Sequence, residues 1–179
     1  ADRYIEVDAV EQNRNVLREE FTGQMCVNCP DAHKTVEALK EQYGDALISV
    51  SIHAGSFAIE EGKLGDKFQT FKTPEGDQYA ALHGVDTYPA GVIDRVSGVQ
   101  LHTSWASAIL SELQRKTTTA LKADAALDGQ QITVTTNVVA QGLTDAKLQL
   151  WLVEDSIVSY QINGEPSPTA YVHNHVYRA

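Results

Sequence analysis

The sequence predicts an α/β segment up to about residue 118, followed by an all-β segment. One helical face is marked by apolar residues at spacings of four, three and four, namely Ala32, Val36, Leu39 and Tyr43. Residues 46–52 form a short apolar run rich in strand-forming residues, which is typical of a buried strand. Further along, two alternating runs flank Asp128-Gly129, a dipeptide that favours a tight hairpin turn.

The first part of the chain is expected to form a strand, a loop and a helix. Residues 1–13 are polar and mixed, which suggests an arm or an edge strand, and residues 15–22 predict a strand. The helix is expected to begin at Cys29-Pro30-Asp31, because proline is tolerated in a first turn, where its missing N–H costs nothing. Gly44 is a good helix stop.

The stretch that follows the second strand, residues 54–76, shows no sustained period and carries several glycines. We expect an irregular insertion with a helical turn. Beyond it the expected elements are a short helix over residues 77–83 ended by Gly84, a strand over residues 90–96 and a helix over residues 104–116.

Beyond residue 118 the pattern is that of strands alone. The hairpin is expected to pair residues 119–127 with residues 131–139. Residues 148–152 and 171–177 alternate in the same way, and residues 161–168 between them are expected to form a loop. Together they predict a small antiparallel β-sandwich over residues 119–179, whose completeness the sequence leaves open. Half a sandwich leaves an exposed strand edge, so we expect either a trimmed domain or a dimer formed through that edge.

The charge and hydropathy of the chain argue against nucleic-acid binding and against a transmembrane segment. The chain has 179 residues and a formal net charge of −10, and such a surface repels phosphate backbones, so no nucleic-acid binding is expected. No apolar run approaches the roughly 18 to 20 residues that span a bilayer, so no transmembrane segment is expected. The chain starts at Ala1 with no signal peptide in view, which is compatible with a mature or trimmed product, because export signals are cleaved off.

Both cysteines lie in residues 21–33, which read FTGQMCVNCPDAH. A disulfide across so small a loop gives little stabilisation in the chain-entropy model. A zinc site needs about four ligands. The candidates for adding ligands to the two cysteines are His33, His173 and His175. A redox pair fits the local physics better, because the positive end of a helix dipole favours a thiolate. Cys26 is therefore the predicted nucleophile and Cys29 the resolving thiol, while structural and metal-binding roles stay open.

Three stretches resemble the thioredoxin-like fold from about residue 14 to residue 117. They are REEFTGQMCVNCP, ALISVSI and YAALHGVDTYPAGVID. The resemblance implies a thioredoxin-like domain, a central mixed sheet flanked by helices, over residues 1–118 with the insertion at about 54–76. It also implies that Glu20 relays a proton to the resolving cysteine, although this position usually holds Asp, and a salt-bridged or solvated strand residue is the alternative. Pro89 is expected to be cis, with Tyr88 offering its backbone to a bound substrate chain.

A second set of stretches resembles the outer-membrane-protein-related thioredoxin-like family of Bacteroidetes. These stretches are EEFTGQMCVNCPDAH, DTYPAGVIDR and LQLWLVEDSIVSYQ, followed by YVHNHVYR near the end of the chain. The resemblance implies thiol–disulfide chemistry and an exported protein in the periplasm, in the outer membrane or at the cell surface. The β-domain of that family continues beyond the position of Ala179.

Several residues around the cysteines are candidates for contact with a substrate. Met25, Val27 and Asn28 surround the pair, and Met25 suits either a docking surface or core packing. His33 is expected at the surface, with a role in modulating the thiolate as the alternative. The insertion contributes aromatic residues that anchor the loop or cover the site, namely Phe57, Phe68 and Phe71.

Three functions compete at this point. The favoured one is an exported oxidoreductase that exchanges a disulfide with protein substrates and needs no cofactor. The second is an envelope binding module in which the disulfide is static. The third is a copper- or zinc-handling protein, in which histidines complete the cysteine pair.

Overall fold

The structure is a computed structural model that describes residues 11–63, 65, 67–140, 142 and 144–179. Most of the predicted arm at residues 1–13 lies outside the described residues. The chain divides into two compact units. The larger, the core unit, consists of Asn15–Glu112 and Leu150–Ala179, and the smaller, the hairpin unit, consists of Ala1–Arg14 and Leu113–Gln149.

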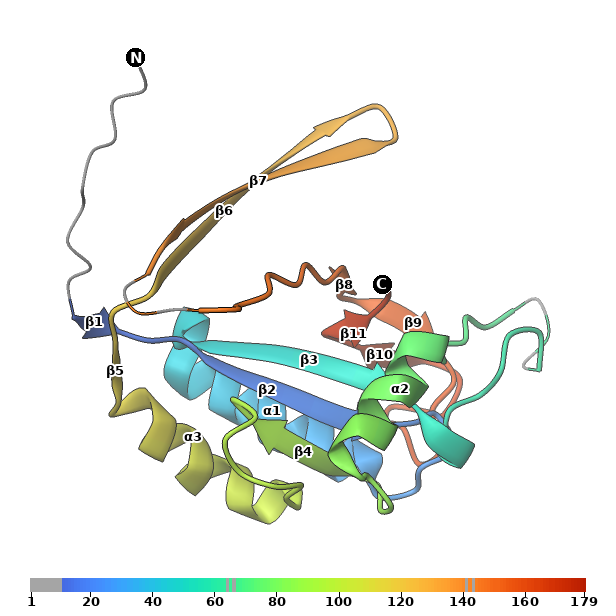
Figure 1. The fold of residues 1–179 in the computed structure, drawn as a ribbon. Coiled ribbons are helices and arrows are strands. Elements are labelled where there is room, and N and C mark those ends of the chain that lie inside the picture. Colours follow the sequence, from blue (N-terminus) through green and yellow to red (C-terminus); the bar gives the residue numbers. More distant parts are fainter. Residues whose placement is uncertain (1–10, 64, 66, 141, 143) are drawn as a thin grey trace. The chain divides into compact units, whose positions relative to one another are not determined.

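A five-stranded mixed sheet forms the centre of the core unit, in the order β4-β2-β3-β11-β8 (Figure 1). Its strands are β2 (Val16–Thr22), β3 (Leu47–His53), β4 (Ala90–Ile93), β8 (Val153–Glu154) and β11 (Val176–Tyr177). Strand β2 pairs with β3 in parallel and with β4 in antiparallel fashion, and β11 runs parallel to β3 and antiparallel to β8. The expected α/β class, a mixed sheet with flanking helices, is confirmed at this level.

Three helices accompany the sheet: α1 (Cys29–Tyr43), α2 (Pro74–His83) and α3 (Trp105–Leu113). Successive residues of a strand point to opposite faces, so β2 shows which helix covers which face. Arg18 lies over the Trp105 ring of α3, and Glu20 lies 3.5 Å from the His33 ring of α1. Phe21 instead packs against α2. Helices α1 and α3 therefore cover one face of the sheet and α2 covers the other.

The helix boundaries follow from capping residues. Helix α1 begins with Pro30 in its first turn and ends at Gly44, as predicted. Helix α2 begins three residues earlier than expected, because the Thr73 hydroxyl accepts a hydrogen bond from the backbone N–H of Gly76. It ends at Gly84, whose left-handed conformation (φ 67°) suits a residue without a side chain.

Two predicted strands are shorter in the structure, and one predicted stretch is not a strand. Residues 90–96 form a strand only as far as Ile93, because Asp94 and Arg95 adopt positive φ angles and turn the chain. Residues 171–177 are divided into β10 (Tyr171–His173) and β11 by a left-handed turn at His175. Residues 148–152 alternate in sequence but do not form a strand, and Leu152 makes backbone hydrogen bonds with Arg178 and Ala179 at the end of the chain.

The C-terminal segment is part of the core unit. Strand β9 (Ile157–Ser159) pairs with β10, and β11 lies between β3 and β8 in the central sheet. The Tyr177 side chain of β11 is buried in the main apolar cluster with Phe21, Val50, Ile52, Ala54, Ala80 and Val92. The compact units therefore do not coincide with the predicted boundary at residue 118, and the assignment of two domains stays a prediction.

The described residues of the hairpin unit form two strand pairs. Strands β6 (Ala120–Asp128) and β7 (Gln131–Val139) form the predicted hairpin, with Gly129 in the left-handed conformation that the turn requires (φ 59°). The short strands β1 (Gln12–Asn13) and β5 (Lys116–Thr117) form the second pair. Within the described part of the chain, no helix combines the length and the apolar character that crossing a membrane demands.

Candidate functional site

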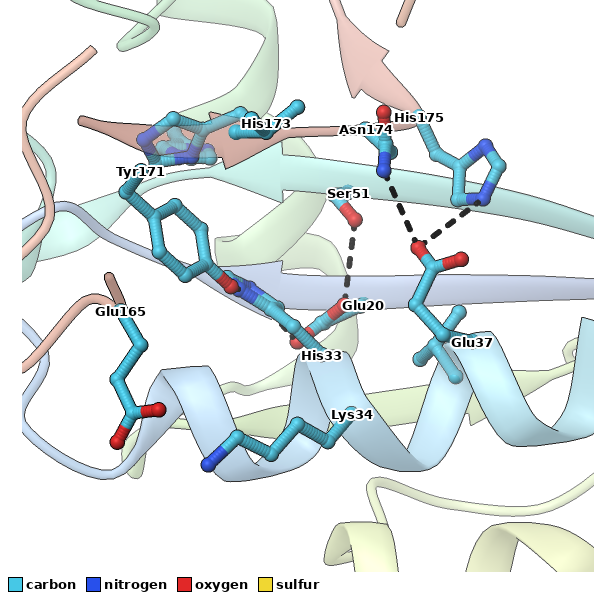
Figure 2. Close-up of a pocket in the computed structure, with 13 residues that line it drawn as sticks. Glu20, His33, Lys34, Glu37, Ser51, Glu165, Tyr171, His173, Asn174 and His175 are labelled. Atoms are coloured by element: carbon cyan, nitrogen blue, oxygen red, sulfur yellow. Dashed lines mark hydrogen bonds and ion pairs between the residues drawn. The ribbon is translucent and has the colours of Figure 1, made fainter. Parts of the chain in front are cut away.

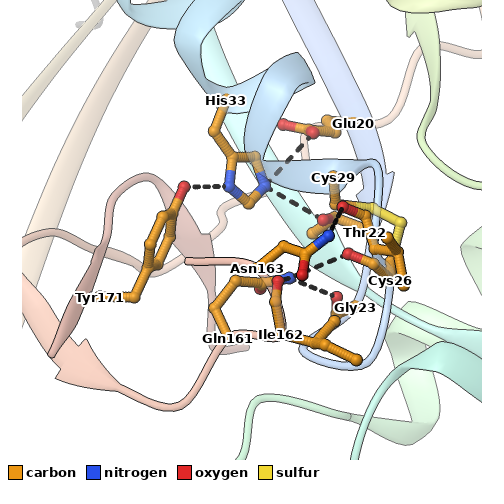
Figure 3. Close-up of a disulfide and its surroundings, with 11 residues drawn as sticks. Glu20, Thr22, Gly23, Cys26, Cys29, His33, Gln161, Ile162, Asn163 and Tyr171 are labelled. Atoms are coloured by element: carbon orange, nitrogen blue, oxygen red, sulfur yellow. Dashed lines mark hydrogen bonds and ion pairs between the residues drawn. A yellow bond between two sulfur atoms is a disulfide. The ribbon is translucent and has the colours of Figure 1, made fainter. Parts of the chain in front are cut away.

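The two cysteines form a disulfide at the start of α1 (Figure 3). The sulfur atoms of Cys26 and Cys29 lie 2.04 Å apart, and the Cα atoms lie 5.3 Å apart. Cys29 is the first residue of the helix, directly after the loop that leaves the central strand β2. Both cysteines are buried, with exposed fractions of 2% for Cys26 and 0% for Cys29.

A segment from the far end of the chain holds the loop that carries the cysteines. The buried Gln161 side chain donates from Nε2 to the backbone carbonyls of Cys26 (3.1 Å) and Gly23 (3.3 Å). Two residues later, Asn163 donates from Nδ2 to the carbonyl of Val27 at 3.4 Å. Figure 3 shows Gln161, Ile162 and Asn163 beside the disulfide loop. No local sequence pattern pairs residues so far apart, and the sequence analysis did not find them.

Gln24, which belongs to the cysteine loop, makes hydrogen bonds in the opposite direction, toward the insertion and the C-terminal segment. Its buried side chain donates from Nε2 to the carbonyls of Gln69 (3.0 Å) and Tyr160 (3.1 Å). The backbone N–H of Ile162 in turn donates to the carbonyl of Gln24 at 2.9 Å. Two buried glutamines thus connect the cysteine loop with the chain that follows β9.

The insertion contributes an apolar rim to the site. The backbone N–H of Met25 donates to the carbonyl of Phe57 at 2.9 Å, and the Phe57 ring lies 5.4 Å from the Tyr88 ring. The side chains of Met25, Val27 and Phe57 are exposed by 42%, 51% and 38%. Core packing of Met25 is therefore excluded. Phe57 lies at the site, whereas Phe71 is buried and anchors the insertion.

The peptide bond between Tyr88 and Pro89 is cis, as predicted. Strand β4 begins at the next residue, Ala90, which pairs with Phe21 of β2. Since β4 runs antiparallel to β2, Pro89 lies level with Thr22, the last residue of β2. The cis-proline therefore lies at the end of the strand from which the cysteine loop departs.

Glu20 is buried in the middle of the sheet and is ion-paired. Its Oε2 accepts from Arg18 Nη1 at 2.8 Å and from the Ser51 hydroxyl at 3.2 Å. Glu20 and Arg18 both have no exposed side-chain surface. Burial lowers the pKa of Arg18, and the attraction of Glu20 partly opposes that shift. The salt-bridged interpretation of Glu20 is confirmed, and its proton-relay role stays a prediction.

The predicted surface position of His33 is wrong. Its side chain is only 15% exposed, because it is enclosed between β2 and the C-terminal segment. The Nε2 atom lies 3.1 Å from the Thr22 hydroxyl, and Nδ1 lies 2.6 Å from the Tyr171 hydroxyl. Burial lowers the pKa of His33, although the nearby Glu20 carboxylate acts in the opposite direction. The sequence reasoning also missed Tyr171.

Beside His33 lies a cavity of about 330 Å³ between α1, the sheet and the C-terminal segment (Figure 2). Its lining includes His53, His173 and His175. Burial lowers the pKa of His173 to about 3 and that of His53 well below its usual value, with the neighbouring imidazoles as a second cause. The His53 and His173 rings meet edge to face, with centroids 5.5 Å apart.

The two histidines of the predicted C-terminal strand lie in different surroundings. His173 ends β10 and is buried, while His175 lies in a left-handed turn and pairs with Asp155 at 3.0 Å. Among the described residues, no group of three or more histidine, cysteine, aspartate or glutamate side chains is arranged to hold a metal ion. Asn28, the residue before α1, makes no side-chain capping hydrogen bond.

Comparison with solved structures finds two chains of similar fold. One is HBP35 of Porphyromonas gingivalis, with a TM-score of 0.67 and 15% identity over 93% of this chain. The match spans only 56% of that protein. The other is a crystal structure of an Agrobacterium tumefaciens protein, with a TM-score of 0.57 and 14% identity over 94% of this chain and 72% of that one. At such identities the likeness concerns the fold alone.

Sequence comparison with curated proteins finds no match. The family model for outer membrane protein Omp28 matches residues 76–179, which is more than half of the chain and includes Gln161 and Tyr171. The matched region begins in α2, after both cysteines. A protein of this family is exported and resides at the outer membrane or the cell surface. The chain belongs to the Omp28 outer membrane protein family.

Proposed function

We propose that the core unit is a thioredoxin-like domain and that the protein exchanges disulfides with protein substrates outside the cytoplasm. The observation that carries this proposal is the Cys26–Cys29 disulfide at the N-terminus of α1, directly after a central strand. The helix dipole and the free N–H groups of a first turn stabilise a thiolate at such a position. The cis-proline at the neighbouring strand end supports the same assignment.

The chemistry is an exchange of two electrons between two dithiol–disulfide pairs. In the reduced protein, the Cys26 thiolate attacks a substrate disulfide and forms a mixed disulfide, releasing one substrate thiolate. Cys29 then loses its proton and attacks the Cys26 sulfur, which breaks the mixed disulfide and releases the second substrate thiolate. We assign the acceptance of the Cys29 proton to Glu20, and the reverse sequence oxidises a substrate dithiol.

The apolar rim provides a surface for an unfolded or extended substrate segment. Met25, Val27 and Phe57 expose apolar surface around the cysteine loop. Tyr88 contacts Phe57 and precedes the cis-proline, so its backbone is placed to accompany a bound chain. The acidic protein, with a net charge of −10, favours substrates without excess negative charge.

The burial of Cys26 requires a movement before exchange. With an exposed fraction of 2%, this residue offers almost no surface to an attacking thiolate. The contacts that must yield are those of the Gln161 segment and of the Phe57 loop, because both hold the cysteine loop from outside. Substrate binding to the apolar rim would supply the free energy for this opening.

The decisive experiment measures the reduction potential of the pair by equilibration with glutathione and thiol trapping. A value between about −270 and −120 mV supports an exchanging pair. Cys29→Ser should then accumulate a mixed disulfide with substrate proteins from an envelope extract, whereas the matched variant Cys26→Ser should accumulate none. Equal trapping by both variants would contradict the assigned roles.

The same burial favours a second candidate function, an envelope binding module with a static disulfide. A disulfide that no thiol reaches resists reduction, and structural disulfides lie below about −300 mV. A potential in that range, together with no mixed disulfide in Cys29→Ser, would favour this second function.

A further inference from the structure

Three polar side chains connect the interior of the sheet with the cavity. Glu20 Oε1 lies 3.5 Å from His33 Nε2, and His33 Nδ1 lies 2.6 Å from the Tyr171 hydroxyl. Each comes from a different element: β2, α1 and β10. Figures 2 and 3 show the His33 ring between Glu20 and Tyr171. The contacts form a continuous series that begins at a carboxylate with no exposed surface.

The inner end of this series lies under the helix start that carries Cys29. Cys29 and His33 are four residues apart on α1, so they share one helix face. Glu20 and Thr22 are two residues apart on β2 and share one strand face. His33 contacts both of them, so these two faces oppose each other. Glu20 is therefore covered by the first turns of α1.

The outer end of the series reaches solvent through the cavity. Tyr171 and His33 both line the cavity of about 330 Å³. Most of the exposed lining is apolar, but carboxylate, imidazole and hydroxyl groups are among the residues that line the cavity, and its volume is large enough for water molecules held by these groups. Glu20 also lines it but has no exposed side-chain surface. Its polar neighbours on the cavity side are the Ser51 hydroxyl, which donates to Oε2, and His33, which in turn contacts Tyr171.

Burial lowers the pKa of His33 and so favours the neutral form of its ring. The facing charged and titratable groups are Glu20 and Arg18 on β2, Glu37 on α1, His53 on β3, and His173 and His175 in the C-terminal segment. Their influences oppose one another, and burial is the largest influence on the His33 pKa and lowers it. A neutral imidazole has one N–H donor and one acceptor nitrogen, so it can take a proton at one nitrogen and release one from the other.

We propose that His33 and Tyr171 conduct the proton of the resolving step from Glu20 to water in the cavity. The inference rests on the proposed oxidoreductase function and adds a proton path to it. His33 and Tyr171 act through Glu20 and are positioning residues, and Cys26 and Cys29 remain the reacting groups. Tyr171 lies within residues 76–179, the part of the chain that matches the family model.

The step balances as follows in the direction that reduces a substrate. Cys29 gives its proton to the Glu20 carboxylate, and the resulting thiolate forms a bond to the Cys26 sulfur while the bond to the substrate sulfur breaks. Glu20 passes the proton to Nε2 of His33, Nδ1 gives its own proton to the Tyr171 oxygen, and the Tyr171 hydroxyl releases its proton to water. The substrate leaves as a thiolate and takes a proton from solvent.

The test follows the two half-steps separately in the reduced full chain. The probe is 5,5′-dithiobis(2-nitrobenzoate), a small aromatic disulfide that releases one coloured thiolate when Cys26 attacks and a second when Cys29 resolves the mixed disulfide. Stopped-flow absorbance resolves the two phases. The first phase reports the nucleophile, and the second reports the resolving step to which the proposed path belongs.

Tyr171→Phe and His33→Asn should each slow the second phase at pH 7 by roughly 100-fold, the low end of what a positioned proton-transfer group contributes. The first phase should keep its rate. The double variant should be no slower than either single variant, because both residues serve one path. Tyr160→Phe is the matched control, since it removes a hydroxyl from the same segment outside the series of contacts, and both of its phases should match the parent protein.

Two further readouts separate a proton path from a structural role. The defect of Tyr171→Phe should shrink above about pH 8.5, where a free thiol ionises unaided. Added imidazole should restore the second phase, because the cavity admits a small proton acceptor. A Tyr171→Phe protein with a normal second phase, or with both phases slowed equally at every pH, would overturn the path and leave the proposed function intact. A parent protein without a first phase would overturn the proposed function itself.

Discussion

Arg18 and Glu20 lie two residues apart on β2 and pair at 2.8 Å with no exposed side-chain surface on either. Arg18 also donates from Nε to the Ser49 hydroxyl at 2.9 Å and lies over the Trp105 ring, 4.8 Å from its centroid. A buried charge is costly to desolvate, and its partner compensates that cost. Each of the two buried charges is therefore stable only while the other is present.

Removal of one charge of this pair should lower the free energy of unfolding far more than removal of both charges. Arg18→Met leaves the Glu20 carboxylate buried without its partner, and the free energy of unfolding should fall by about 3–5 kcal/mol. In the double variant Arg18→Met/Glu20→Leu, most of this loss should be recovered. Urea unfolding of the oxidised proteins measures both values, and a double variant as unstable as the single one would contradict the mutual dependence.

Gln161→Ala should loosen the cysteine loop. The change removes the side-chain donor that serves the carbonyls of Gly23 and Cys26. Loss of two hydrogen bonds should lower the free energy of unfolding by about 1–2 kcal/mol. The disulfide should also be reduced faster by dithiothreitol, because one of the contacts that hold the loop from outside is lost. Gln42→Ala, at an exposed position of α1, is the control and should change neither quantity.

The buried histidines should make the folded protein less stable at acid pH. The pKa of His173 is lowered from its ordinary value of 6.5 to about 3 by burial, so the unfolded chain binds a proton at this residue between these values and the folded chain does not. Stability therefore rises with pH across this window and is lost as pH falls through it, by up to about 1.4 kcal/mol per pH unit for each such group.

Unfolding measured in urea between pH 7 and pH 4 tests this dependence. His173→Phe should be less stable at pH 7, because the Tyr160 carbonyl loses its contact with the imidazole. Its stability should nevertheless decline less steeply toward pH 4 than that of the parent protein. Parallel slopes for the two proteins would mean that His173 takes no part in the acid sensitivity.

Gly23→Ala should disturb the contact between the cysteine loop and the insertion. A Cβ atom at this position would lie 2.4 Å from the carbonyl carbon and oxygen of Phe57, and both belong to the backbone. Relief of such overlap requires a backbone shift, for which a loss of about 1–3 kcal/mol is typical. Gly98→Ala is the control, since its Cβ would meet no atom within 4 Å, and its stability should not fall.

Local signals made the surroundings of the cysteines predictable. Proline in a first turn, an apolar face at helical spacing and a glycine stop together located α1 to within a residue. The apolar run ALISVSI identified β3, and Asp128-Gly129 identified the hairpin. Each of these signals lies within a few residues of the element it specifies.

The partners of the cysteine loop could not be predicted in this way. Gln161 and Cys26 are 135 residues apart, and a single glutamine in a polar loop gives no sign that it will be buried. The alternation in residues 171–177 predicted strand structure but could not indicate that β11 pairs with β3. His33 looked like a surface residue for the same reason, since both Glu20 and Tyr171 reach it through tertiary contacts.

The position of β11 between β3 and β8 has a consequence for biosynthesis. A chain emerges from the ribosome N-terminus first, so both cysteines are made long before Gln161, Tyr171 and β11. Until Leu150–Ala179 arrives, β3 has an unpaired edge and the cysteine loop lacks the glutamine that holds it. The thiols of the nascent protein are therefore more accessible than those of the finished one, and oxidation of the pair during export can precede completion of the fold.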